Sequence, residues 1–422
     1  MFNEDIQYVS GELCVENASL ARIAEKTGTP CYVYSFNRIK RNFLELESVF
    51  ASFSPLIAYA VKANSNIAVI NILAQLGAGA DVVSMGEIRR SLTAGIAPGK
   101  VVFSGVGKTG TEMEFAFGNG IGQYNIESLE ELHDLNAAAV ATRRIANVAV
   151  RVNPDVAAGG HAKISTGRSP DKFGIPLAMA EDACRAAAEL SNINLTGLGV
   201  HIGSQIMDVA PYVDAFRVIA CKTVELREKG YTINTLDLGG GFGIPYDNEK
   251  KFPYAAYSDA VRELIQPLGV RIIVEPGRSL VADAGLLVSR AVRTKETPLR
   301  KFLILDAAMN DLMRPALYDA THPLAPVVMA DEPGAELWDI VGPVCETSDT
   351  FARQHVMKRQ DRDGLVAIGL TGAYGATLAN EYNSRPLVPE VMVKGSEWKV
   401  IRPRPDLAEI LSRDQIPDWS QN

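Results

Sequence analysis

The sequence predicts an α/β protein that consists of a (β/α)8 barrel and a mainly β C-terminal domain. Short apolar runs rich in Val and Ile recur through the first two thirds of the chain, with amphipathic stretches between them. Apolar strands that alternate with helices are typical of a parallel sheet covered on both faces. Eight such units in succession favour a closed barrel over an open, doubly wound sheet. After about Asp283 the alternation ends, and strand-like runs follow without regular helices.

Eight short apolar runs are predicted as the barrel strands. A helix is predicted over 66–77, because its apolar residues recur at helical spacing and Gly77 would end it. The stretch 254–269 has the same character. A Gly- and Ser-containing segment from Asp155 to Gly174 interrupts the barrel after the fifth strand, and such segments are commonly functional loops. The predicted strands are 56–61, 80–84, 100–104, 122–126, 146–152, 195–201, 235–238 and 271–275.

Three parts of the chain are predicted as structural divisions. Residues 1–30 would pack with the β domain, residues 31–283 would form the barrel, and residues 284–422 would form the C-terminal β domain. Residues 30–34 could also supply a strand to that domain, since chain termini often lie close together. The strand predictions of the last domain cover 286–296, 300–307, 337–344 and 363–370.

The composition is that of an ordinary globular protein, with 47% hydrophobic and 22% charged residues, which excludes a disordered or fibrous chain. The net charge of -8 argues against a nucleic-acid-binding surface. Five scattered cysteines without a Cys-x-x-Cys pair favour a reducing compartment. The N-terminus lacks the apolar region of a secretory signal, and no apolar run approaches the ~18 residues of a membrane span. We therefore expect a soluble cytoplasmic protein with no membrane or nucleic-acid partner.

Chemically diverse residues stand where the predicted barrel strands end. Lys62 follows the first strand, Asp81 lies in the second, His201 closes the sixth, glycines 239–241 follow the seventh, and Glu275 closes the eighth. Barrel chemistry sits at the C-terminal ends of the strands. We therefore expect these side chains to meet at one mouth of the barrel.

Each of these positions has a functional and a structural interpretation. Desolvation of Lys62 would lower its pKa, as a Schiff-base amine requires, but a lysine can also simply reach solvent. The amides of the consecutive glycines could approach a phosphate closely, or the glycines could form a tight turn. Glu275 could hold a heteroaromatic nitrogen protonated while Arg278 binds a carboxylate or phosphate, or the two could form a rim ion pair.

His201 suits stacking on a flat cofactor ring, with Ser204 near enough to donate to a phosphate, although a lone histidine can also be structural. No HxxxH spacing is present, so no metal site is expected. The stretch 104–110 matches G-x-G-x-x-G, but it lies mid-barrel and the match is weak. It is also similar to a P-loop, except that Val102 replaces the first required glycine, so no nucleotide site is inferred.

Six motifs, YAVKAN, HIGSQ, GGGFG, EPGR, CE and GAY, follow one another between Tyr59 and Tyr374. In this order they resemble the fold-type III pyridoxal-phosphate-dependent decarboxylases, which have an alanine racemase-like architecture. Within that group the chain most resembles the diaminopimelate decarboxylases, through Glu346 after Cys345, EPGRS and the segment 308–323. CETSD departs from the usual Cys-Glu-Ser-Gly-Asp of that family, which affects local loop shape more than chemistry because Thr347 keeps a hydroxyl.

The resemblance implies pyridoxal 5'-phosphate as cofactor. Lys62 would form the internal aldimine, Asp81 would line the pocket, His201 would stack on the ring, and Glu275 would pair with the pyridine nitrogen. The phosphate would be held by Ser204, Gly241, Gly277 and Arg278.

The resemblance also implies a reaction, decarboxylation of meso-2,6-diaminopimelate to L-lysine and CO2, the last step of lysine biosynthesis. Cys345 would reach the site from the neighbouring subunit of a homodimer, and either Cys345 or Lys62 would protonate the product carbon. Glu346 would bind the distal ammonium of the substrate. The other expected substrate contacts are Arg278, Arg314 and Tyr318 for a carboxylate, and Tyr374 for both cofactor and substrate.

Three alternatives are compatible with the same motifs. A decarboxylase of ornithine, lysine or arginine is the nearest, although ornithine decarboxylases carry Asp at the position of Glu346. An amino-acid racemase would need a second base on the opposite face of the ring. A non-catalytic pyridoxal-phosphate-binding homologue would keep the fold but usually loses the lysine, the cysteine or EPGR, all of which are present here.

Overall fold

The computed structural model describes residues 3–156, 172–246, 250–329 and 334–420. The chain forms two compact units. One consists of Ile39–Val281, and the other combines Met1–Arg38 with Ala282–Asn422.

The unit Ile39–Val281 contains a closed ring of eight parallel strands, as the sequence predicts. The ring closes where the last strand, β13, pairs with the first, β5, and where β8 pairs with β9. Each observed strand boundary lies within two residues of the prediction. A short additional strand, β10 (Ile175–Pro176), pairs with β9 outside the ring. The ring strands are β5 (Leu56–Ala60), β6 (Gly79–Val82), β7 (Val101–Phe103), β8 (Gln123–Ile126), β9 (Ala146–Asn153), β11 (Ile193–Gly199), β12 (Thr235–Gly240) and β13 (Arg271–Glu275).

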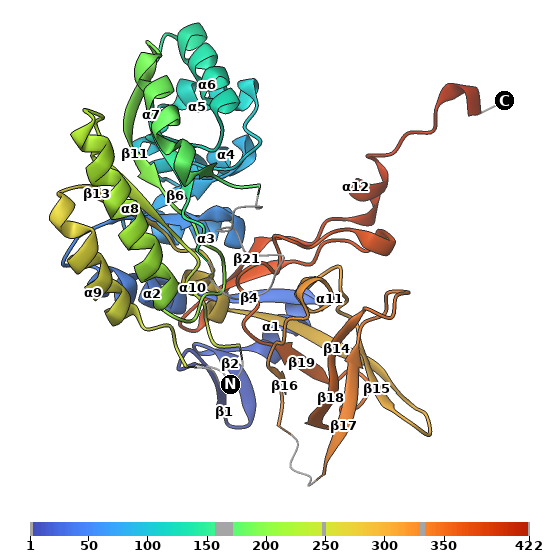
Figure 1. Ribbon diagram of the computed structural model, residues 1–422. Helices are drawn as coiled ribbons and strands as arrows, with labels where there is room; N and C mark the ends of the chain where they lie inside the picture. Colours follow the sequence, from blue (N-terminus) through green and yellow to red (C-terminus); the bar gives the residue numbers. More distant parts are fainter. Residues whose placement is uncertain (1–2, 157–171, 247–249, 330–333, 421–422) are drawn as a thin grey trace. The chain divides into compact units, whose positions relative to one another are not determined.

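Helices surround the ring of strands (Figure 1). Side-chain caps start several of them directly after a strand end: Asn66 caps α3, Ser84 caps α4, and Thr109 forms a capping box with Glu112 on α5. Such caps satisfy N–H groups that lack a partner within the helix. The helices are α2 (Phe36–Val49), α3 (Ile67–Gln75), α4 (Met85–Thr93), α5 (Gly110–Asn119), α6 (Leu129–Thr142), α7 (Ala180–Glu189), α8 (Ala210–Glu228), α9 (Tyr254–Leu264) and the short α10 (Arg278–Val281).

The P-loop-like segment has a structural role in the barrel. Lys108 Nζ donates hydrogen bonds at 2.7 Å to the carbonyl oxygens of Gly105 and Asn125. It also forms a 2.5 Å ion pair with the buried Glu131 on α6. The lysine that a P-loop would direct at a phosphate is therefore engaged inside the protein.

The second unit is mainly β, as predicted. A small antiparallel sheet joins β1 (Ile6–Val9), β2 (Glu12–Val15) and β3 (Ala18–Ser19). A nine-stranded sheet follows the order β18-β17-β15-β14-β4-β20-β21, with β16 and β19 off this path. Its strands are β4 (Cys31–Ser35), β14 (Gly285–Glu296), β15 (Lys301–Leu305), β16 (Leu324–Pro326), β17 (Ala335–Val341), β18 (Thr350–Lys358), β19 (Leu365–Ile368), β20 (Glu390–Lys394) and β21 (Glu397–Arg402).

Three short helices complete this unit, namely α1 (Leu20–Thr27), α11 (Arg314–Tyr318) and α12 (Leu407–Leu411). A hydrophobic core forms where α1 and the small sheet pack on the large one. It includes Leu13, Leu20, Ile23, Val33, Leu286 and Val391.

The strand β4 corrects the predicted start of the barrel at residue 31. It pairs antiparallel with β14 and parallel with β20, and all five of its residues are buried. Because both edges of β4 are hydrogen-bonded within the large sheet, residues 31–38 belong to the β unit and the barrel unit begins at Ile39. The other boundary differs by two residues, at 281 instead of 283.

Most of the predicted functional loop from Asp155 to Gly174 lies outside the described residues. In the part of the chain that the structure describes, no helix combines the length and the apolar character needed to cross a lipid bilayer.

Candidate active site

The C-terminal ends of the barrel strands bring the predicted residues together. Lys62 lies in a single 3-10 turn directly after β5, and Asp81 lies in β6. His201 follows β11 by two residues, and Glu275 is the last residue of β13. Because the strands are parallel and closed into a ring, these positions share one end of the barrel.

Lys62 and Asp81 form an ion pair between Nζ and Oδ2. The Asp81 side chain is 1% exposed, whereas that of Lys62 is 39% exposed. A close carboxylate favours the charged form of an amine. The Lys62 side chain is thus partly exposed, and its amine is paired with a buried acid.

The imidazole of His201 is neutral and its orientation is fixed. The backbone N–H of Gly240 donates a hydrogen bond to Nδ1 at 3.2 Å. Burial lowers the pKa of His201 well below its ordinary value, and the nearby cations Arg151 and Lys62 lower it further. The ring therefore carries its single proton on Nε2.

The glycine run after β12 makes the close approach to His201 possible. Gly239 has φ +65°, and a Cβ there would lie 2.8 Å from His201 Nδ1. Gly241 has φ +93°, and a Cβ there would lie 2.2 Å from the carbonyl oxygen of Gly203. Glycine is needed at both positions for backbone conformation and for space.

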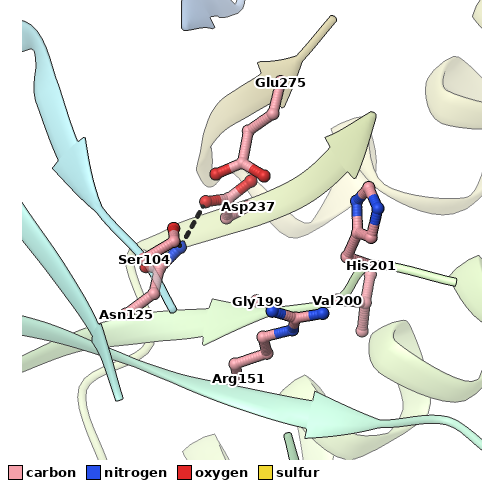
Figure 2. A pocket seen from close by; sticks show the side chains of 8 residues that line it. All are labelled: Ser104, Asn125, Arg151, Gly199, Val200, His201, Asp237 and Glu275. Atoms are coloured by element: carbon pink, nitrogen blue, oxygen red, sulfur yellow. Dashed lines mark hydrogen bonds between the residues drawn. The ribbon is translucent and has the colours of Figure 1, made fainter. Parts of the chain in front are cut away.

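A buried acid pair lies inside the barrel mouth. Asp237 on β12 is 2% exposed and Glu275 is 8% exposed. Burial and the carboxylates of Asp237 and Asp81 raise the pKa of Glu275 well above its ordinary value. The two acids line a small pocket together with His201, Arg151 and Asn125 (Figure 2). Sequence reasoning missed Asp237, although an acid inside the apolar run LDLGG was a usable signal.

Arg278 and Ser204 also meet at this end of the barrel. Arg278 is 7% exposed, and its guanidinium donates to Ser204 Oγ at 3.2 Å and to the Tyr246 hydroxyl at 2.8 Å. The neighbouring Gly277 packs closely, because a Cβ there would lie 3.0 Å from Cβ of Ala60. Tyr246 is a further contact of this cluster that the sequence did not indicate.

The remaining predicted residues belong to the β unit. Arg314, at the start of α11, is buried, and its Nη1 lies 2.8 Å from Nε2 of His322. Nδ1 of His322 lies 2.9 Å from the carbonyl oxygen of Gly369 and donates to it, so Nε2 accepts from the arginine. Tyr318 is at the other end of the same helix, and Tyr374 has a left-handed backbone with φ +56°. His322 was not predicted.

Cys345 and Glu346 lie on an exposed loop that Asp349 anchors. The carboxylate of Asp349 accepts hydrogen bonds at 2.7 Å from the backbone N–H groups of Val344 and Met309. Glu346 accepts hydrogen bonds from Tyr382 at 2.5 Å and from Ser348 at 3.0 Å.

These two donors lower the pKa of Glu346 and keep it anionic. Asp349 and Tyr382 were not identified from the sequence.

The residues of the barrel mouth fit pyridoxal phosphate. Oε1 of Glu275 and Oδ1 of Asp81 are buried and accept no hydrogen bond within the described part of the chain. Buried acceptors of this kind need a polar partner. Lys62 offers a primary amine for the aldehyde of this cofactor, and Glu275 offers a buried acid for its ring nitrogen. His201 offers a flat neutral ring for the ring face, and Arg278 with Ser204 suits the phosphate. Among the described residues, no cluster of His, Cys, Asp or Glu is placed to hold a metal ion.

Comparison with known proteins supports this assignment. Residues 36–282 match the family model of the pyridoxal-dependent decarboxylases, pyridoxal binding domain. The chain is 45% identical to diaminopimelate decarboxylase of Zymomonas mobilis, over 97% of this chain and 98% of that protein. Among solved structures it is similar to diaminopimelate decarboxylase of M. jannaschii in complex with L-lysine, with a TM-score of 0.94, 36% identity and coverage of 99% of both chains. The Helicobacter pylori enzyme complexed with L-lysine has a TM-score of 0.90 and 37% identity, over 93% of this chain and 98% of that one.

Proposed function

Because the chain belongs to the pyridoxal-dependent decarboxylases and, within them, to the diaminopimelate decarboxylases, we propose that it converts meso-2,6-diaminopimelate to L-lysine and CO2. This reaction is the last step of lysine biosynthesis. The observation that carries the proposal is the arrangement of Lys62, Asp81, His201, Glu275 and Arg278 at one end of the barrel. The relatives solved with bound L-lysine, the product of this reaction, support the choice of substrate.

The residues of the barrel mouth would hold the cofactor. Lys62 would bind it covalently, His201 would lie against its ring, and Glu275 would pair with the ring nitrogen. When bound, pyridoxal phosphate supplies an electron sink for the pair of electrons left by the departing CO2. Ser204, Gly241, Gly277 and Arg278 would hold its phosphate, and Asp81 and Tyr374 would complete its pocket.

Lys62 has a second task, which is proton transfer. Its ion pair with Asp81 favours the ammonium form, and an ammonium can donate a proton. Lys62 or Cys345 would give that proton to the substrate carbon that has lost CO2. Cys345 is exposed and is a free thiol, which suits a residue that acts in a partner's site.

Substrate selection would fall to the β-unit residues together with Arg278. Diaminopimelate differs from ornithine or lysine by a second carboxylate, which needs additional positive charge. Arg278 and Arg314 can each bind a carboxylate through two N–H groups, and Tyr318 can add a hydroxyl donor. Glu346, which Tyr382 and Ser348 keep anionic, would bind the distal ammonium.

The assembly would be a homodimer in the cytoplasm. A dimer would allow Cys345 of one subunit to complete the site of the other, so an isolated monomer should be inactive. All five cysteines are free, which fits a reducing compartment.

The test is an assay of the purified protein with pyridoxal phosphate and meso-diaminopimelate, ornithine, arginine or alanine, following CO2 and amine products. We expect lysine from diaminopimelate alone. Lys62→Ala should lower the rate at least about a thousandfold and abolish covalent retention of the cofactor after borohydride reduction. Lys100→Ala, a lysine outside the site, is the matched control and should keep both.

Each contrary outcome of this assay has a definite meaning. Turnover of ornithine with silence on diaminopimelate would assign the chain to the basic amino-acid decarboxylases and contradict the role of Glu346. Racemised alanine without CO2 would indicate a racemase. Cofactor binding without turnover of any substrate would indicate a non-catalytic homologue.

A further inference from the structure

Asp237 and Glu275 form a buried pair of acids. The proposed function gives a role to Glu275 but none to Asp237. Asp237 lies on β12, and its carboxyl group lies against that of Glu275 at the end of β13 (Figure 2). Both side chains are withdrawn from solvent, at 2% and 8% exposure. Two carboxyl groups in this position can form a hydrogen bond with each other only if one of them carries a proton.

The two acids do not both ionise. Two adjacent carboxylates cannot both ionise in a buried site, since each raises the pKa of the other. Burial, Asp237 and Asp81 raise the pKa of Glu275, and the smaller effect of Lys62 lowers it. Loss of both protons is therefore strongly disfavoured.

The donors around the pair show where that proton lies. Asn125 Nδ2 donates to Oδ2 of Asp237 at 2.8 Å, and the backbone N–H of Gly239 donates to Oδ1 at 3.0 Å. Gln123 Nε2 donates to Oδ1 of Asn125 at 2.8 Å, which orients the amide NH2 group of Asn125 toward Asp237. Burial raises the pKa of Asp237, but these two donors stabilise its carboxylate, whereas Oε1 of Glu275 accepts no hydrogen bond within the described residues. We therefore assign the charge to Asp237 and the proton to Glu275.

The charged groups around the pair cannot replace Asp237. Lys62 and Asp81, at the ends of β5 and β6, form an ion pair with each other. Arg151 on β9 forms a 3.0 Å ion pair with Glu127, and His201 is held neutral. Asp237 is the acid whose carboxyl group lies against that of Glu275 in Figure 2.

We propose that Asp237 is a positioning residue for Glu275, which shares a single proton with it and thereby allows Glu275 to become a carboxylate without adding a second buried charge. The inference rests on the proposed function, in which Glu275 pairs with a protonated ring nitrogen. As that nitrogen approaches, the O–H bond of Glu275 breaks and an O–H bond forms on Asp237. The negative charge moves from Asp237 to Glu275, and the pair keeps one proton and one charge throughout.

The experiment is infrared difference spectroscopy of the cofactor-free protein as a function of pH. Wild type minus Glu275→Gln identifies the C=O band of the protonated acid near neutral pH. In Asp237→Asn, the pH at which this band disappears should fall by at least about one unit, a tenfold loss of proton affinity, because the neighbouring charge is gone. Thr235→Val, on the same face of β12, is the matched control and should leave the band at its wild-type pH.

Asn125→Leu is a second variant that tests the same pair without altering either acid. Removal of the Asn125 donor destabilises the Asp237 carboxylate, so the proton should shift from Glu275 toward Asp237 and the band that Glu275→Gln identifies should weaken. Circular dichroism verifies that each variant folds. A band of unchanged pH dependence in Asp237→Asn and of unchanged intensity in Asn125→Leu would overturn the proposal, since burial alone would then protonate Glu275.

The spectroscopic result is independent of the proposed reaction. A protein that fails to decarboxylate diaminopimelate but shows these shifts would contradict the proposed function and leave the shared proton intact. A fully active protein without the shifts would overturn only the role of Asp237.

Discussion

The backbone N–H of Gly240 donates a hydrogen bond to Nδ1 of His201 at 3.2 Å, so the end of β12 fixes the tautomer of the imidazole. The donor is held in place because Gly239, with φ +65°, leaves no Cβ between the strand and the ring. A neutral, oriented ring suits a position against a flat cofactor better than a charged one, which water would solvate.

The first expectation concerns the pH dependence that this histidine imposes. Because the pKa of His201 is lowered in the folded protein, the unfolded chain binds a proton first as the pH falls below about 6.5. The stability that His201 contributes is therefore present above that pH and is lost as the pH falls toward the folded pKa. Denaturant unfolding at several pH values should show a smaller loss of stability on acidification for His201→Gln than for wild type.

His133→Gln, on the exposed face of α6, is the control for this measurement. It should keep the wild-type slope of stability against pH. An identical slope for His201→Gln and wild type would contradict the neutral imidazole.

The second expectation concerns substrate recognition by Arg314. Arg314→Ala should lower kcat/KM for diaminopimelate by about 10- to 100-fold, the effect of losing a charged hydrogen bond, and leave cofactor affinity unchanged. Arg314→Lys should give an intermediate value, because a lysine keeps the charge without the fork of N–H groups. Steady-state kinetics and cofactor titration measure the two quantities, and an equal loss of both would contradict a role in substrate binding.

The third expectation concerns the loop that carries Cys345 and Glu346. Asp349→Ala leaves the N–H groups of Val344 and Met309 without their acceptor, which should cost about 1–3 kcal/mol in the free energy of unfolding. Decarboxylation should fall as well, because the loop loses its anchor, while the cofactor stays bound. Denaturant unfolding and activity assays test both effects, with Asp361→Ala at an exposed position as the control. Full activity of Asp349→Ala would mean that the loop conformation is unimportant.

The fourth expectation concerns the lysine of the P-loop-like segment. Lys108→Met removes the cation from the buried Glu131, and an unpaired buried charge should destabilise the protein by about 3–5 kcal/mol. The double variant Lys108→Met, Glu131→Gln should recover part of that loss, because the stranded charge is removed. Chemical denaturation measures both values. A double variant no more stable than the single one would show that the ion pair is not the cause.

Much of the barrel could be predicted because its signals are local. An apolar run of the right length identifies a strand wherever it lies in the chain, and the parallel ring then fixes which strand ends share a mouth. The predicted positions of Lys62, Asp81, His201 and Glu275 follow from that rule alone. The start of the barrel was predicted wrongly because the sequence of a strand does not show which other strands it pairs with. β4 pairs with β14, about 250 residues away in sequence.

The barrel, the β unit and the order of the motifs that identify the family could be predicted, because periodicity and motif spacing are properties of the chain alone. How these residues act on one another depends on the folded arrangement. The pairing of Lys62 with Asp81, the neutrality of His201 and the proton shared by Asp237 and Glu275 all depend on distance and burial. β12 and β13 align Gly240 with Glu275, with an irregularity after Asp237, and only this register brings the two acids together.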